Sequence, residues 1–278
     1  MNTPAVPSTP VEVTPPRRTA HQRAGAPPNR RLTWWLRVLS LCIILVLWEW
    51  YGRRTNPILF TYPTAIGLAA LDMLADGSLP KALGQSLYVL SLGFALGTLS
   101  GGVLGLLTGR SMIAAALLDI PVTALYATPM VALVPLLVLW FGFGRPAKIM
   151  VVLLFTVFPV LLNTSRGVRE VDPRLVEVAY AFCSNEYRLW IDLVLPSALP
   201  FVMTGIRLAI GRALIAVIVA EFYTAISGLG YLIVSNAHAF QTARVFVPVV
   251  VLMLLGIVTT GLLEVAEARI APWRQAQT

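Results

Sequence analysis

Long apolar runs recur along the whole chain, and they limit its possible folds more than any other feature. The runs predicted as membrane spans are about Trp35–Tyr51, Ser86–Thr108, Asp119–Phe141, Lys148–Asn163, Phe201–Phe222 and Val245–Leu263. A helix needs about 20 apolar residues to cross the hydrocarbon core. The first and fourth runs are short and need flanking residues or a thinner bilayer. Since only helices satisfy their backbone hydrogen bonds within one apolar segment, we expect an all-α polytopic membrane protein with about six transmembrane helices.

The composition agrees with a membrane protein. Of the 278 residues, 57% are apolar and 12% are charged, against about 25% charged in soluble domains. The net charge of +8 comes from arginines in short segments beside the apolar runs, a pattern typical of orientation signals in membrane proteins. Nucleic acid is therefore not expected as a partner.

The first 33 residues differ from the rest of the chain. They hold seven prolines and five arginines, a composition that cannot bury a core and predicts a disordered, basic, Pro-rich cytoplasmic arm. The first apolar run ends in Trp48-Glu49-Trp50-Tyr51. This ending is typical of an interface anchor rather than of a signal-peptide cleavage site, so we expect the first helix to remain attached.

The distribution of Lys and Arg predicts the orientation of the chain. With the N-terminus inside, the inner segments hold 13 of these residues and the outer segments hold six. Cytoplasmic loops carry the excess of positive charge, which predicts both termini in the cytoplasm. The polar segment 164–200 then also lies in the cytoplasm.

Two spans have unusual residues in their interiors. The second carries glycines four residues apart, at Gly93, Gly97, Gly101, Gly105 and Gly109. Positions four apart share a helix face, so this face either packs closely on a neighbouring helix of the same chain or forms a dimer seam or a sliding surface. The third span holds Pro121, Pro129 and Pro135, which predicts a kinked helix that lines a cavity or changes shape.

Residues for bond chemistry or metal binding do not form a recognisable set. The two lysines, Lys81 and Lys148, lie outside any G-x-x-x-x-G-K-[ST] sequence, which excludes that ATP site. The histidines His21 and His238 are far apart, and no G-x-S-x-G sequence occurs. We therefore predict no catalytic residues, no metal site and no cofactor. The two cysteines, Cys42 and Cys183, do not imply a disulfide.

The polar segment 164–200 carries the most specific signal. It contains Glu177, Ala179, Ala181 and Cys183, followed later by Leu193-Val194-Leu195-Pro196. This order resembles the E-A-A-x-x-x-G loop and the following I-x-L-P of permeases from binding-protein-dependent ABC importers. Two positions depart from that pattern: Val178 replaces Ala, and Cys183 replaces Gly, which permits a turn that is costly for Cys where φ is positive.

Other segments resemble the nitrate, sulfonate and taurine permeases of this family. They are Leu137–Gly142, Thr204–Gly211, Ala220–Phe222 and Ser227–Ile233. The resemblance covers roughly Ala82 to Leu263. It divides the chain into the arm (1–33), the first transmembrane helix with an extracytoplasmic linker (34–81), a type-1 permease core (82–265) and a cytoplasmic tail (266–278).

The resemblance implies the fold of a type I importer permease in the bacterial inner membrane. The implied partners are a second copy of the chain, two ABC ATPase subunits and an extracytoplasmic solute-binding protein. Glu177, Ala179, Ala181, Cys183, Leu195 and Pro196 would form the loop that couples the permease to its ATPase. The implied cargo is a small anion such as nitrate, a sulfonate or taurine, and the alternative is a vitamin precursor such as a thiamine pyrimidine.

Charged residues within the fifth run are the remaining candidates for function. Arg207 lies near the cytoplasmic end, where its side chain can reach the interface. Arg212 and Glu221 are deeper and are candidates for the translocation path, since ionisable residues in spans usually face a bundle interior or water. Nine positions along one helix point them in opposite directions, so we do not expect them to pair. A passive channel and an intramembrane enzyme are the rival functions.

Overall fold

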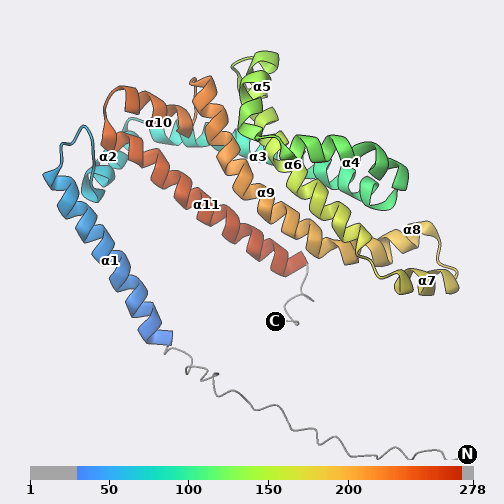
Figure 1. The fold of residues 1–278 in the computed structure, drawn as a ribbon. Coiled ribbons are helices and arrows are strands. Elements are labelled where there is room, and N and C mark those ends of the chain that lie inside the picture. Colours follow the sequence, from blue (N-terminus) through green and yellow to red (C-terminus); the bar gives the residue numbers. More distant parts are fainter. Residues whose placement is uncertain (1–29, 271–278) are drawn as a thin grey trace, which may run out of the picture. The chain divides into compact units, whose positions relative to one another are not determined.

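The computed structural model describes residues 30–270, and within this range all regular elements are helical (Figure 1). The α-helices are α1 (Arg30–Arg54), α2 (Pro63–Ala75), α3 (Ser78–Arg110), α4 (Met112–Ala127), α5 (Val134–Phe141), α6 (Arg145–Arg169), α7 (Pro173–Ala181), α8 (Glu186–Arg188), α9 (Leu195–Thr224), α10 (Leu229–His238) and α11 (Thr242–Ile270). A 3-10 helix, η1 (Met130–Leu133), precedes α5, and a π-helix, η2 (Leu189–Val194), precedes α9.

The chain divides into two parts between Leu47 and Trp48. The first part contains the beginning of α1. Most of the predicted N-terminal arm, residues 1–29, lies outside the described residues, as do residues 271–278 of the predicted tail. All packing described below belongs to the second part.

The expectation of about six membrane helices is confirmed. Five helical stretches within residues 30–270 are long and apolar enough to cross a bilayer: Thr33–Arg54, Ser78–Arg110, Arg145–Arg169, Glu186–Thr224 and Thr242–Arg269. A sixth is obtained when α4 and the helical stretch Met130–Phe141 are counted together.

The third run, predicted as one kinked span over Asp119–Phe141, is instead broken. Its two halves meet at an angle of 94°. Pro121 lies inside α4, Pro129 precedes η1 and Pro135 lies in the first turn of α5. Proline has no N–H and disfavours helical backbone in the residue before it. Thr128, the residue before Pro129, is extended, so the break falls at Pro129, whereas Pro135 lies within the continuous helical stretch Met130–Phe141.

Several predicted boundaries were also wrong. The helix that contains the fourth run, α6, has 25 residues and uses flanking residues on both sides, from Arg145 to Arg169. The segment 164–200 is mostly helical and not a long polar loop, since it contains the end of α6, all of α7, α8 and η2, and the start of α9. The linker within 34–81 also contains α2, which was not predicted.

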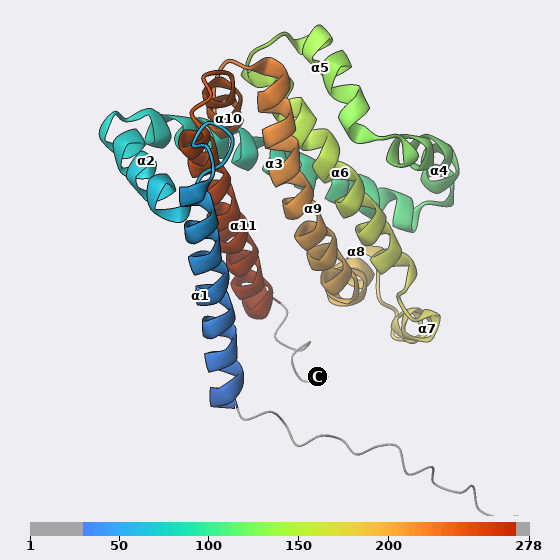
Figure 2. The same cartoon turned by 60° about the vertical axis from the view of Figure 1, so that its left-hand side comes forward.

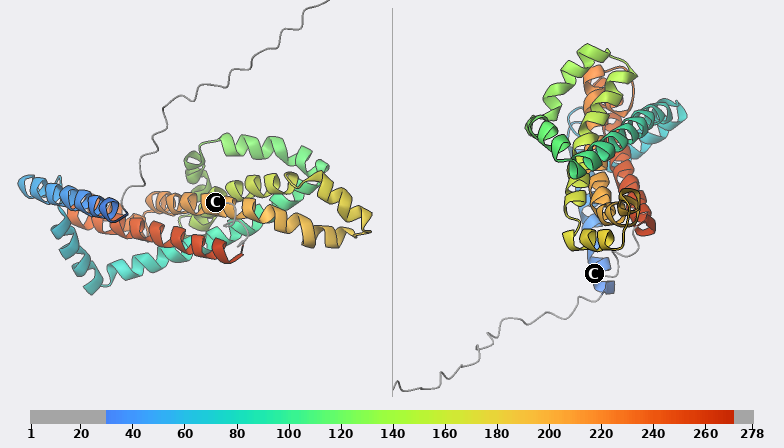
Figure 3. Two further views of the ribbon diagram at one scale, coloured as in Figure 1. Left: turned by 90° about the horizontal axis from the view of Figure 1, so that it is seen from below. Right: turned by 90° about the vertical axis from the view of Figure 1, so that its right-hand side faces the viewer.

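The main core of the second part is built from α3, α6 and α9. Helix α3 crosses the α6–α9 pair obliquely, as Figure 3 shows. Buried residues of these helices, with Val134, Leu137 and Val138 from the α5 segment, form one apolar cluster.

The glycines of α3 lie in the contact with α6 of the same chain. A Cβ atom added to Gly93, Gly97, Gly101, Gly105 or Gly109 would come within 2.5 to 2.6 Å of α6 atoms. At Gly101 the atom met is the backbone carbonyl oxygen of Val157. Close approach of two membrane helices requires such small residues. Of the alternatives for the glycine face, the structure therefore shows packing on a neighbouring helix of the same chain.

A second apolar cluster joins α2, the start of α3, α10 and α11 (Figure 2). The end of α1 is tied to it by side-chain hydrogen bonds. The Trp48 indole donates to the carbonyl oxygen of Thr61 at 2.8 Å, and Glu49 accepts from the backbone N–H of Thr64 at 3.1 Å. Thr64 lies in the first turn of α2, where a carboxylate is favoured by the free N–H groups. The predicted anchor sequence thus also orients α2.

Candidate coupling and translocation sites

Helix α7 holds Glu177, Ala179 and Ala181 of the predicted coupling loop, and hydrogen bonds cap both of its ends. The Asp172 carboxylate accepts from the backbone N–H of Arg174 at 2.9 Å, which caps the first turn. At the other end, the N–H of Cys183 donates to the carbonyl of Tyr180 and the N–H of Ser184 to that of Ala179. This pair of bonds is a Schellman motif.

Cys183 occupies the left-handed position of that motif, with a φ of 53°. This is the position at which helix ends most often carry glycine, because a Cβ atom is unfavourable there. The resembled family has Gly at this position. This chain forms the turn with a cysteine, and the Cys183 side chain is exposed.

Helix α7 exposes apolar side chains together with an acid. Val176 and Ala179 pack on a buried cluster that includes Val168 and Leu189. On the rest of the helix surface, Leu175 and Val178 are about half exposed, Phe182 is 84% exposed, and Glu177 and Ala181 are also exposed. Exposed apolar patches of this kind usually mark a contact surface.

Glu186 connects α7 to the end of α3. One carboxylate oxygen accepts from the Tyr180 hydroxyl at 2.7 Å, and the other pairs with the Arg110 guanidinium at 2.8 Å. The hydrogen bond to the carboxylate raises the pKa of the Tyr180 phenol. Sequence reasoning missed this group because Arg110 lies 76 residues before Glu186.

The other residues of the predicted coupling motif lie apart from α7. Leu195 and Pro196 form the first turn of α9, directly after the π-helix η2. Because α9 continues directly from η2, Pro196 lies within the longer helix Glu186–Thr224, where its missing N–H removes one backbone hydrogen bond. These residues connect the α7–α8 segment to α9.

The two arginines of α9 have different partners. Arg207 forms an ion pair with Glu267 of α11. The Arg212 guanidinium donates to the Tyr126 hydroxyl at 2.9 Å and lies 5.1 Å from the centre of the Tyr126 ring. Tyr126 belongs to α4 and its ring also contacts that of Phe158 in α6. The described residues give Arg212 no ion pair with an acid, and its side chain remains partly exposed.

Glu221, the other candidate for the translocation path, is completely buried. Its carboxylate accepts from the Ser86 hydroxyl at 2.7 Å and from the backbone N–H of Gly230 at 2.8 Å. The structure does not bring Arg212 and Glu221 together. Glu221 lies in a network that sequence reasoning did not find, because its side-chain partner Ser86 comes from a distant helix.

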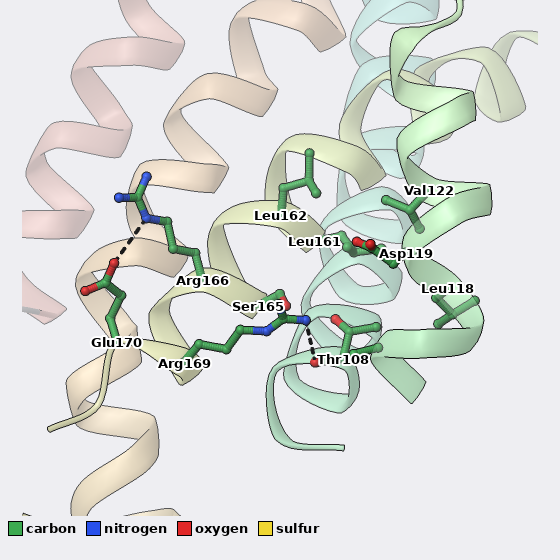
Figure 4. A pocket seen from close by; sticks show the side chains of 11 residues that line it. Thr108, Leu118, Asp119, Val122, Leu161, Leu162, Ser165, Arg166, Arg169 and Glu170 are labelled. Atoms are coloured by element: carbon green, nitrogen blue, oxygen red, sulfur yellow. Dashed lines mark hydrogen bonds and ion pairs between the residues drawn. The ribbon is translucent and has the colours of Figure 1, made fainter. Parts of the chain in front are cut away.

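A cavity of about 330 Å³ lies between α4 and α6 beside the end of α3. Figure 4 shows Leu118, Asp119 and Val122 on the α4 side and Leu161, Leu162 and Ser165 on the α6 side. Arg169 donates across it to the carbonyl of Thr108 at 3.1 Å. Within residues 30–270 no group of three or more His, Cys, Asp or Glu side chains could hold a metal ion.

Comparisons with known proteins agree on one family. Residues 101–272 match the model described as "Binding-protein-dependent transport system inner membrane component". A putative aliphatic sulfonates transport permease of Bacillus subtilis is 32% identical, over 94% of this chain and 95% of its own length. Its Escherichia coli counterpart is 34% identical, over 80% of this chain and 87% of its own.

A formylaminopyrimidine transport permease of Halalkalibacterium halodurans is 32% identical, over 86% of this chain and 96% of its own length. Among solved structures, an amino acid ABC transporter determined with histidines superposes with a TM-score of 0.52. That comparison covers 69% of this chain and 91% of the other at 15% identity, and it therefore supports the fold alone.

Proposed function

Since the chain belongs to the family of inner-membrane components of binding-protein-dependent transport systems, we propose that it imports a small organic anion, of which a sulfonate is the best-supported example. The chain is a multi-pass permease, and its relatives are transport proteins and not enzymes. Two relatives that are 32% and 34% identical are described as sulfonate permeases, which supports this cargo. A third relative, 32% identical, is described as a formylaminopyrimidine permease, so a pyrimidine precursor is the second candidate cargo.

The proposed mechanism is alternating access driven by a partner ATPase. The proposed assembly has two copies of this chain, two ATPase subunits and one extracytoplasmic binding protein. We place both termini in the cytoplasm, which is supported by the excess of Lys and Arg in the corresponding segments. The division into arm, linker with first helix, permease core and tail is retained as part of the same proposal. A passive channel would have no use for an ATPase-docking surface.

The surface that would dock the ATPase is the exposed side of α7, including Glu177, Val178, Ala181 and Phe182. The observation that carries this proposal is the apolar and acidic surface of a short helix whose inner side is anchored. Ala179 holds α7 to the bundle core, and Tyr180 holds it to Glu186 and so to Arg110 of α3. A push on the outer side of α7 would therefore be passed to α3 through Glu186 and to the start of α9 through η2.

Reversing the charge at Glu177 tests the docking role. We expect Glu177→Lys to leave the amount of inserted permease unchanged and to reduce ATPase co-purification and solute-stimulated ATP hydrolysis at least five-fold. The matched control is Asp192→Lys, which reverses an exposed acid of η2 at the same end of the bundle. Normal co-purification and hydrolysis for Glu177→Lys would refute the docking role. Equal losses in both variants would assign the effect to the changed net charge at this end of the bundle and not to Glu177 itself.

Arg212 is the residue that we propose for the translocation path. The described residues hold the Arg212 guanidinium by one hydroxyl and an aromatic ring and give it no acid, so its positive charge is available to an anion that leaves water. We expect Arg212→Gln to slow uptake per assembled complex about ten-fold, and Arg212→Lys to retain part of the rate because it keeps the charge but loses the planar fork. Uptake and complex yield are measured together. A loss of yield with normal uptake per complex would show that Arg212 only holds the bundle.

A further inference from the structure

A buried polar network surrounds the turn between α9 and α10, at the end of the bundle opposite to α7 (Figure 1). We call it the Glu221 network; it consists of Ser86, Lys148, Glu221 and Ser227 with the backbone N–H groups of Leu229 and Gly230. Glu221 accepts from Ser86 and Gly230, and the Ser86 hydroxyl oxygen itself accepts from the N–H of Leu229 at 2.9 Å. The carboxylate therefore lies at the N-terminus of α10, where a negative charge is favoured.

Lys148 approaches the same turn from the beginning of α6. Its side chain is 2% exposed, and its ammonium donates to the carbonyl oxygen of Ser227 at 2.7 Å and to the Ser227 hydroxyl at 3.0 Å. Lys148 and Glu221 form no direct ion pair within 4.0 Å among the described residues. The turn thus lies between two buried ionisable side chains, each bound to it by hydrogen bonds.

Two glycines allow the turn to approach the carboxylate. Gly228 has a φ of 103°, and a Cβ atom added to it would lie 1.9 Å from a carboxylate oxygen of Glu221. A Cβ added to Gly230 would lie 2.7 Å from the Cβ of Glu221. The Ser227-Gly228-Leu229-Gly230 sequence is therefore the part of the turn that fits around Glu221.

We propose that the Glu221 network holds the α9–α10 turn (residues 225–228) in the same conformation throughout the transport cycle. Helix α10 and the adjoining ends of α3, α6 and α9 then move as one unit. Opening the turn would leave an ammonium and a carboxylate in an apolar interior without their hydrogen-bond partners, which is strongly unfavourable. Glu221, Ser86 and Lys148 are then positioning residues rather than contacts of the solute. The role in a cycle rests on the proposed importer function.

Amine labelling of the assembled transporter tests this proposal, because the chain has only two lysines. Lys81 lies at the same end of the bundle, near the turn, and is exposed, whereas Lys148 is buried in the network. The complex in lipid discs is treated with acetic anhydride, without nucleotide and after trapping with ATP and vanadate, and each lysine is quantified by mass spectrometry. We expect Lys81 to react at least ten times faster than Lys148 in both states. Similar rates for the two lysines in either state would overturn the proposal.

Matched serine variants test the contribution of the network itself. Ser86→Ala removes the hydroxyl that links Glu221 to Leu229, whereas the control Ser91→Ala removes an exposed hydroxyl of the same helix that bonds only to its own helix backbone. We expect Ser86→Ala alone to speed labelling of Lys148 several-fold and to lower uptake per complex. Unchanged labelling would refute the positioning role of Ser86. Absence of uptake by the native complex would refute the importer function and leave the labelling result valid.

Discussion

At the scale of single residues, Cys183 shows how one side chain is kept in an unfavourable backbone conformation. Its φ of 53° costs a residue with a Cβ atom about 1–2 kcal/mol. We expect Cys183→Gly to stabilise the end of α7 against local opening by ~1 kcal/mol. The backbone amide of Ser184, whose hydrogen bond completes the turn, should then exchange its hydrogen roughly five times more slowly. Cys183→Ala keeps a Cβ atom and serves as the control. Equal exchange in the two variants would mean that the strain is relieved elsewhere in the turn.

At the scale of helices, the contact between α3 and α6 depends on glycine, and adjacent glycines provide a test. A Cβ at Gly101 would lie 2.5 Å from a backbone oxygen of α6, whereas a Cβ at Gly102 meets nothing within 4 Å. We expect Gly101→Ala to destabilise the protein by about 1–3 kcal/mol and Gly102→Ala to be neutral or slightly stabilising. Thermal unfolding in detergent measures both. Equal midpoints would show that α6 moves aside without cost.

At the scale of the whole molecule, the two ends of the bundle are predicted to face opposite sides of the membrane. Cys183 is exposed beside α7, and Ile226 is exposed in the α9–α10 turn at the other end. In a chain lacking Cys42, a membrane-impermeant thiol reagent should label Cys183 only after the cells are opened. In a chain lacking both native cysteines, Ile226→Cys should be labelled in intact cells. Labelling of Cys183 in intact cells would reverse the proposed orientation.

The long apolar runs predicted the fold class and the short motifs predicted the family, because both features depend on local sequence. Runs of apolar residues determine which segments can cross a bilayer, and the segment 173–196 carries its motif within one stretch of chain. The glycine spacing in α3 predicted a close helix contact for the same local reason. Which helix it contacts, and whether in the same chain, required the structure.

The sequence by itself therefore determined the approximate number and the order of the membrane-crossing helices, the membrane environment and the position of the α7 segment. Tertiary structure alone decided the pairing of Arg212 with Tyr126 and the hydrogen bond between the buried Glu221 and Ser86. The physical reason is distance along the chain. Ser86 and Glu221 are 135 residues apart, and Lys148 and Ser227 are 79 residues apart. No local pattern specifies such partners, because helix packing alone brings them together.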